Sequence, residues 1–109
     1  MEVSSPFGSQ TRTRVLVALS LLDQSYAREL ARLLRVPNSV IQKAVLSLER
    51  DGLVSARSVG RTRAVTVNPR YFARRELLVY LGRLAETEER LRNAIAGLRR
   101  RPRRSGKRL

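Results

Sequence analysis

The feature that most constrains this chain is a pair of short helical segments separated by a break. Apolar side chains recur at helical spacing over residues 27–34 and again over residues 39–51. Pro37 disfavours helical backbone at the residue before it, so the first segment ends there. Asn38 is a good helix N-cap and Gly52 a good helix stop, so both ends of the second segment are marked. The pattern predicts two short helices that meet across a turn of three to four residues.

The second of these helices has two chemically different faces. One face is apolar and carries Ile41, Ala44, Val45 and Leu48, whereas the opposite face is small and polar in its first half. This arrangement is typical of the DNA-reading helix-turn-helix motif, whose second helix enters the major groove. Because serine, glutamine and lysine can form hydrogen bonds with base edges, we expect base contacts from Ser39, Gln42 and Lys43. The alternative is an exposed polar helix face without a partner.

Elements on both sides of these two helices complete the pattern. A first helix capped by Ser9 is expected to run through about Leu22. Strands over residues 53–58 and 63–68 are expected to pair around a four-residue turn. Arginines cluster at the tip of this hairpin, where they would touch phosphates or enter the minor groove. A solubilising hairpin tip is the alternative. The residues predicted to contact DNA are Arg28, Asn38, Ser39, Gln42, Lys43, Ser47, Arg57, Arg61 and Arg63.

The apolar period changes to a heptad after residue 70. The seam residues, with one polar member, are Leu77, Leu81, Leu84, Glu88, Leu91, Ile95 and Leu98. Such spacing predicts one long helix over residues 71–98 that pairs two chains, and Glu88 would then help to fix the register. A helix folded back on its own domain is the alternative. The basic residues 99–109 have no apolar pattern and are expected to be disordered when unbound.

Composition limits the function classes that remain. Among 109 residues there are 23 basic and nine acidic side chains, a formal charge of +14, which favours an anionic partner such as nucleic acid or an acidic membrane surface. The chain has no cysteine and no histidine, so we expect no disulfide, no metal site and no cofactor. No glycine-rich phosphate loop is present, and the carboxylates fall mostly into helix charge pairs, so an enzyme is not expected. The apolar runs are too short for a bilayer and the start lacks a signal-peptide pattern, so we expect a cytoplasmic, nucleoid-associated protein.

Four stretches of the sequence resemble winged helix-turn-helix transcription regulators of the ArsR/MarR type. They are Phe7-Gly8-Ser9 before residues 12–22, Arg28-Glu29-Leu30-Ala31, Ser39 to Lys43 with Leu48 to Val54, and Gly60-Arg61. The resemblance covers about residues 7–70 and implies a dimeric repressor or activator that binds a palindromic operator. Metal-sensing members of that group use cysteine and histidine ligands, so metal sensing does not carry over to this chain.

These observations together predict a mainly α fold with a small β-hairpin wing (α+β), a winged helix-turn-helix followed by a long C-terminal helix. The expected organisation is a flexible lead-in (1–8), a DNA-binding domain (9–70), a dimerisation helix (71–98) and a basic tail (99–109). The expected function is sequence-specific binding of double-stranded DNA as a homodimeric regulator, acting as a repressor. The alternatives are a nonspecific nucleic-acid-binding protein of the nucleoid or RNA type, and a winged-helix module that binds another protein.

Overall fold

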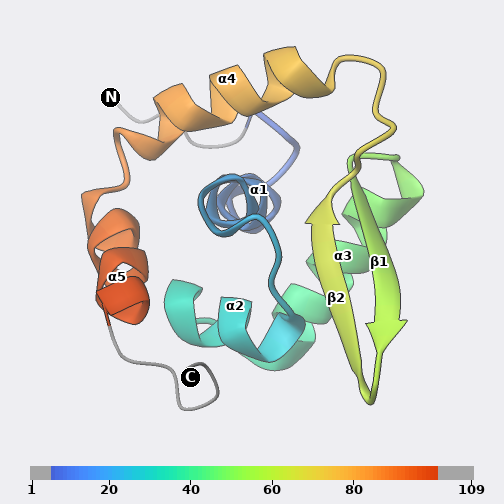
Figure 1. Cartoon of the computed structure of the whole chain (residues 1–109), viewed down its shortest axis with the longest axis horizontal. Coiled ribbons are helices and arrows are strands. Elements are labelled where there is room, and N and C mark those ends of the chain that lie inside the picture. The colour runs from blue at the N-terminus through green and yellow to red at the C-terminus, as the bar shows by residue number, and fades with distance from the viewer. Residues whose placement is uncertain (1–5, 101–109) are drawn as a thin grey trace, which may run out of the picture.

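The computed structural model describes residues 6–100, apart from the side chains of residues 99 and 100. The elements in chain order are α1 (Gln10–Leu22), α2 (Ala27–Leu34), α3 (Asn38–Arg50), β1 (Val54–Val59), β2 (Thr62–Val67), α4 (Arg74–Ala85) and α5 (Glu89–Arg100). Figure 1 shows α1 end-on at the centre, with α4 above it, α2 below it, α5 to the left, and α3 with the hairpin to the right. The mainly helical α+β fold class is therefore confirmed, while residues 101–109 of the predicted tail lie outside the described residues.

α1 occupies the centre because its middle is apolar on every side. Residues 15–19 of this helix are at most 1% exposed. A helix that is hydrophobic all round must be enclosed by other elements, and here the surrounding helices and the hairpin enclose it. The predicted start of the helix is confirmed, since the Ser9 side chain caps it by accepting a hydrogen bond from the Arg12 backbone N–H at 3.1 Å.

The turn between α2 and α3 is short and closed by backbone bonds. The residue after α2, Arg35, caps the helix with a left-handed φ of 60°. The Val36 N–H then donates to the Ala31 carbonyl at 3.1 Å. The prediction that Asn38 caps α3 is wrong by one residue. Pro37 is the cap, and its carbonyl accepts from the Val40 N–H at 3.0 Å, so Asn38 is the first helical residue.

The hairpin is tighter than predicted. β1 and β2 are antiparallel, and Val59 pairs with Thr62, so only Gly60 and Arg61 form the loop instead of four residues. Gly60 has a φ of 63°, which glycine adopts without strain from a side chain. The loop is thereby short enough to hold the wing arginines on a defined ribbon.

The single long helix predicted over residues 71–98 is wrong. The chain turns between α4 and α5, where the Thr87 N–H and hydroxyl both donate to the Leu84 carbonyl, at 2.9 and 2.7 Å. A threonine that bonds to backbone in this way competes with continued helix. α5 therefore folds back along α1 and α2, as Figure 1 shows.

The predicted dimer seam is consequently part of the core of one protomer. The buried members of the seam are Leu77, Leu81, Leu84, Leu91 and Ile95. Glu88 contacts Arg14 of α1, with 3.5 Å between Oε1 and Nε, and Leu98 is half-buried near the end of α5. The five buried side chains are not available as a seam between two chains, and the fold-back alternative describes them correctly.

Candidate nucleic-acid interface

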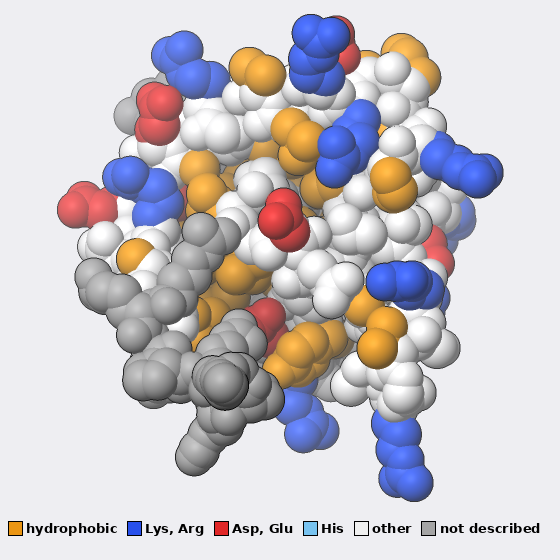
Figure 2. All heavy atoms as spheres, in the orientation of Figure 1, with side chains coloured by type: hydrophobic (Ala, Val, Ile, Leu, Met, Phe, Trp, Pro, Cys, Tyr) orange, Lys and Arg blue, Asp and Glu red, His pale blue; other side chains and the backbone are white. Residues whose placement is uncertain are grey.

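A groove runs between α2, α3 and the hairpin, and we call it the α3–wing groove. Its polar and basic lining side chains are Arg28, Arg32, Asn38, Gln42, Arg61, Thr62 and Arg63. Among the described residues, no carboxylate lines it, whereas four arginines do. Such a groove has a positive potential and suits a polyanion. Figure 2 shows basic side chains projecting at the lower end of the molecule, where the hairpin tip lies.

α3 presents the predicted polar face to solvent. Ser39, Gln42 and Lys43 are exposed, and none of their side chains makes a hydrogen bond or ion pair with another described residue. The helix can expose them because Ile41, on the opposite face, is fully buried. The first half of α3 thus carries free donors and acceptors on a helix anchored from behind.

Leu46 is an apolar side chain that the sequence analysis did not select. It lies one turn beyond Gln42, lines the same groove and is 56% exposed. An exposed leucine in the middle of a polar, groove-lining face matches the apolar contact that proteins make with the thymine methyl group. The sequence already indicated this residue, because Leu46 is an apolar side chain on the polar face of an amphipathic helix.

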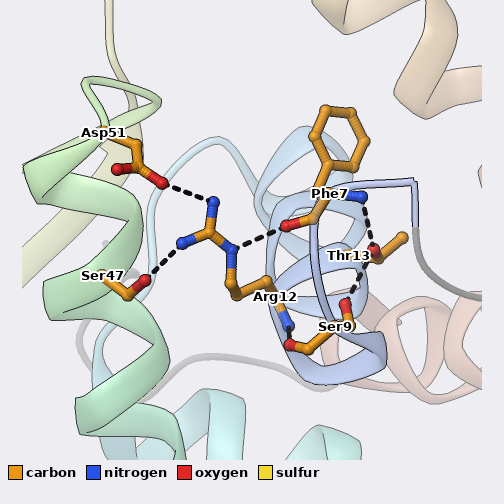
Figure 3. Close-up of polar contacts among 6 residues, drawn as sticks. All are labelled: Phe7, Ser9, Arg12, Thr13, Ser47 and Asp51. Atoms are coloured by element: carbon orange, nitrogen blue, oxygen red, sulfur yellow. Dashed lines mark hydrogen bonds and ion pairs between the residues drawn. The ribbon is translucent and has the colours of Figure 1, made fainter.

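Ser47 does not belong with the free residues of α3. Figure 3 shows that Arg12 of α1 donates to the Ser47 hydroxyl and contacts Asp51, the latter at 2.8 Å between Nη2 and Oδ2. The Arg12 Nε also donates to the Phe7 carbonyl at 2.7 Å. Ser47 is therefore half-buried in a contact that fixes α3 against α1, where its hydroxyl already accepts a hydrogen bond, and the DNA contact expected from it stays a prediction.

The basic residues of α2 and the wing divide into two groups. The side chains of Arg28, Arg57 and Arg61 are exposed and have no hydrogen-bonded or ionic partner in the described part of the chain. Arg63 differs because its Nη2 contacts Glu49 of α3, 3.2 Å from Oε2, although the arginine is still 53% exposed. The free arginines can bind phosphates directly, whereas Arg63 would have to leave the Glu49 carboxylate before it could bind a phosphate.

Two contacts hold the wing in position beside the groove. Ser25, in the α1–α2 connection, exchanges both backbone hydrogen bonds with Val65 of β2, at 3.0 and 2.7 Å. At the base of the hairpin, the Asn68 side chain donates to the Gly52 carbonyl at 2.9 Å. The wing is thus attached to the rest of the fold at its middle and at its base, while its tip remains free to contact a ligand.

A metal-binding cluster and a membrane-spanning helix are both absent from the described residues. No group of three or more metal-ligating side chains occurs in this part of the chain. Within the same residues, none of the helices has both the length and the apolar character needed to cross a membrane.

No protein-family model matches the chain, and no curated protein matches its sequence. Solved structures do match its fold. A variant of ZitR from Lactococcus lactis in complex with DNA is 14% identical, with a TM-score of 0.62, covering 90% of this chain and 66% of that one. A MarR-family transcriptional regulator from Silicibacter pomeroyi is 24% identical, with a TM-score of 0.57, covering 84% of this chain and 57% of that one. A probable transcriptional regulator from Pseudomonas aeruginosa is 24% identical, with a TM-score of 0.59, covering 86% of this chain and 80% of that one.

These likenesses confirm the MarR-type resemblance at the level of the fold. The chain has the winged-helix fold of the transcriptional regulators that it matches. It spans just under two thirds of the ZitR chain and a smaller share of the Silicibacter protein.

Proposed function

We propose that this protein binds double-stranded DNA in a sequence-specific manner as a homodimeric transcriptional regulator, and that it acts as a repressor. The observation that carries the proposal is the α3–wing groove, where four arginines meet Asn38 and Gln42 of α3 without a lining carboxylate in the described part of the chain. Ser39 and Lys43 lie on the same helix outside the groove lining. The fold it shares with a regulator solved in complex with DNA supports the same conclusion.

In the proposed complex, α3 enters the major groove with its N-terminal half foremost. Ser39, Gln42 and Lys43 read base edges, and Leu46 contacts thymine methyl groups beside them. Asn38, the first residue of α3, contacts DNA near the free N–H groups of the helix start. The interior contacts of Ile41 keep this face in a fixed orientation, which sequence reading requires.

The arginines around the groove position the protein on the duplex. Arg28 and Arg32 of α2 bind phosphates on one side of the major groove, and Arg57 and Arg61 of the wing bind phosphates or enter the adjacent minor groove. Arg63 joins them when it leaves Glu49. These contacts contribute affinity and carry little sequence information.

The proposed dimer places one α3 in each half of a palindromic site. Half-sites about 34 Å apart, one helical turn of DNA, are the spacing expected for such a protein. A dimer bound to a site that overlaps a promoter would block the start of transcription there, and this is the proposed repression.

Selection of binding sites from random duplexes tests the proposal. We expect one enriched palindrome for the natural protein, and a weaker, less specific enrichment for the variant with Gln42→Ala and Lys43→Ala. Gln24→Ala is a matched control, because Gln24 is exposed in the α1–α2 connection and does not line the groove. Enrichment of no sequence by a folded protein that still binds DNA would contradict base reading.

The contact proposed for Leu46 has a separate test. Replacing thymine by deoxyuridine in the selected site removes only the methyl groups, and we expect affinity to fall about fourfold for each contacted methyl, from the hydrophobic contribution of one carbon. The Leu46→Ala variant should lose sensitivity to this replacement. Equal losses for both proteins would place the methyl contact on another residue.

A second candidate function is nonspecific binding to nucleic acid. The net charge of +14 favours it, because charge alone supplies most of the affinity of a nonspecific binder. Competition between the selected palindrome, random duplex and structured RNA distinguishes the two functions. Equal competition by all three would favour the second.

A further inference from the structure

A second groove lies between α2 and α5, and we call it the α2–α5 groove. Figure 1 shows α2 and α5 beside each other, with α5 and the hairpin on opposite sides of α2. The charged side chains that line this groove, among the described residues, are Glu29, Arg32, Arg35 and Arg90. The first two belong to α2, Arg35 follows that helix directly, and Arg90 belongs to α5. The fold therefore brings together three arginines that are far apart in the sequence.

The three arginines of the α2–α5 groove are available to a ligand. Arg32, Arg35 and Arg90 are exposed, and none of their side chains makes a hydrogen bond or ion pair within the described part of the chain. Glu29, the carboxylate of the lining, is half-buried, and its Oε1 accepts a hydrogen bond from the Ser25 hydroxyl at 2.6 Å. This carboxylate is thus engaged by the α1–α2 connection, and the groove keeps an excess of positive charge.

The α2–α5 groove continues the basic surface of the α3–wing groove. Arg32 lines both grooves, so the two meet on α2. Leu98 of α5 also lines the α2–α5 groove, and the strongly basic residues 99–109 follow it directly in the chain. Duplex DNA carries a negative charge for about every 1.7 Å of its axis, so it is a ligand that can follow a basic surface beyond the reading helix.

Gly97 leaves part of the α5 backbone uncovered in the α2–α5 groove. Glycine inside a helix is less favourable than alanine, so its presence at this position has a cost in stability. A Cβ at Gly97 would meet no atom of the described residues within 4 Å, so packing in that part of the chain does not require glycine. A residue without a side chain does allow a ligand to approach the helix backbone closely.

We propose that the α2–α5 groove is a second phosphate-binding surface for duplex DNA, which holds the backbone on the side of α3 away from the wing. Arg35 and Arg90 bind neighbouring phosphates there, next to the phosphate that Arg32 binds. The inference rests on the proposed DNA binding and extends it to α5. Because the contacts go to phosphates, they add affinity without adding sequence information.

The first test compares two arginines of α5 that lie two residues apart. Arg90 lines the α2–α5 groove, whereas Arg92 is equally exposed and does not. In fluorescence anisotropy titrations at about 0.1 M salt, we expect Arg90→Gln to weaken binding of the selected duplex about threefold and to flatten the log-log salt dependence by about one unit. Adding Arg35→Gln should double the change in slope, while Arg92→Gln should match the natural protein.

The second test adds a negative charge instead of removing a positive one. Ala94 and Ala96 are both exposed on α5, but only Ala94 lines the α2–α5 groove. At about 0.15 M salt, where charges are screened beyond about 8 Å, we expect Ala94→Glu to weaken DNA binding about tenfold. Ala96→Glu, which makes the same change outside the groove, should alter affinity less than twofold.

Phosphate ethylation interference on the selected duplex locates the contact. Some phosphates should weaken binding of the natural protein when ethylated and have no effect on the variant with Arg35→Gln and Arg90→Gln. These phosphates should differ from those that lose their effect in the variant with Arg57→Gln and Arg61→Gln, which is altered in the wing. Circular dichroism melts establish that each variant, changed only at exposed positions, is folded.

Two results would overturn the proposal while leaving the proposed function intact. One is a natural protein that binds the duplex with the same interference pattern as the variant changed at Arg35 and Arg90. The other is an equal loss of affinity in Arg90→Gln and Arg92→Gln. A natural chain that binds no duplex at all would instead contradict the proposed function, and this contact with it.

Discussion

The arginines of α1 and the arginines around the α3–wing groove are the same residue type in opposite circumstances. Arg12 is 17% exposed and contacts a carboxylate, a hydroxyl and a backbone carbonyl. Arg28, Arg57 and Arg61 are exposed and have no such partner among residues 6–100. The charge of Arg12 is balanced by a carboxylate within the protein, whereas the charges of the groove arginines are available to a ligand. Net charge alone therefore does not identify a binding surface; the positions of the carboxylates do.

The largest expected effect comes from removing the free arginines. With Arg28, Arg57 and Arg61 all changed to glutamine, affinity for duplex DNA should fall on the order of 100-fold at about 0.1 M salt, because three phosphate contacts are lost. The log-log salt dependence should flatten by about three units. Fluorescence anisotropy titrations at several salt concentrations measure both quantities. An unchanged salt slope would mean that the free arginines do not contact phosphates, and would contradict the distinction between paired and DNA-binding arginines.

The next effect is on stability. Arg12→Met should lower the free energy of unfolding by about 2 kcal/mol, because it removes charge-assisted hydrogen bonds that join α1 to α3. Urea denaturation followed by circular dichroism measures the change. Arg28→Met is the matched control and should unfold at the same urea concentration as the natural chain. If Arg12→Met is as stable as that control, Arg12 is not a structural residue.

A smaller loss of stability is expected at the contact between α1 and the α4–α5 turn. The side chains of Arg14 and Glu88 are 25% and 28% exposed, so solvent screens their attraction in part. Arg14→Gln should cost roughly 0.5–1 kcal/mol in the same urea experiment. Arg32→Gln, which changes an exposed groove arginine, should cost nothing measurable, and a larger loss there than at Arg14 would reverse the proposed division of roles.

Arg63 lies between the two groups and sharpens the comparison. Its partner Glu49 competes with phosphate, so Glu49→Gln should free the guanidinium and raise affinity for DNA about twofold at low salt, since an exposed ion pair is weak. Competition binding against the natural protein detects a change of this size. Weaker binding of the variant would mean that Glu49 orients Arg63 for DNA instead of withholding it.

The sequence was a good guide where local signals determine structure. The end of α2 ahead of Pro37 and the stop at Gly52 after α3 follow from backbone preferences, which act within a few residues. The outward polar face of α3 also follows from periodicity, because burying Ile41 on one side exposes Gln42 and Lys43 on the other.

The sequence was a poor guide where the structure depends on which surface an apolar helix face packs against. Heptad spacing of leucines is satisfied by a seam between two chains and by two short helices that each bury one face in the same protomer. The choice depends on the turn at Thr87 and on the contact between Glu88 and Arg14, which joins residues far apart in the sequence. The structural role of Arg12, and with it the contact that engages the Ser47 hydroxyl, depends on another such long-range contact.

The most direct test of the proposed interface is a map of backbone amide shifts in the ¹⁵N-labelled protein when a selected duplex is added. We predict that the largest shifts occur in the first half of α3 and at the hairpin tip around Arg61, with smaller shifts at Arg28. Shifts confined to α4 and α5, or none at low salt, would contradict the assignment of DNA binding to the α3–wing groove.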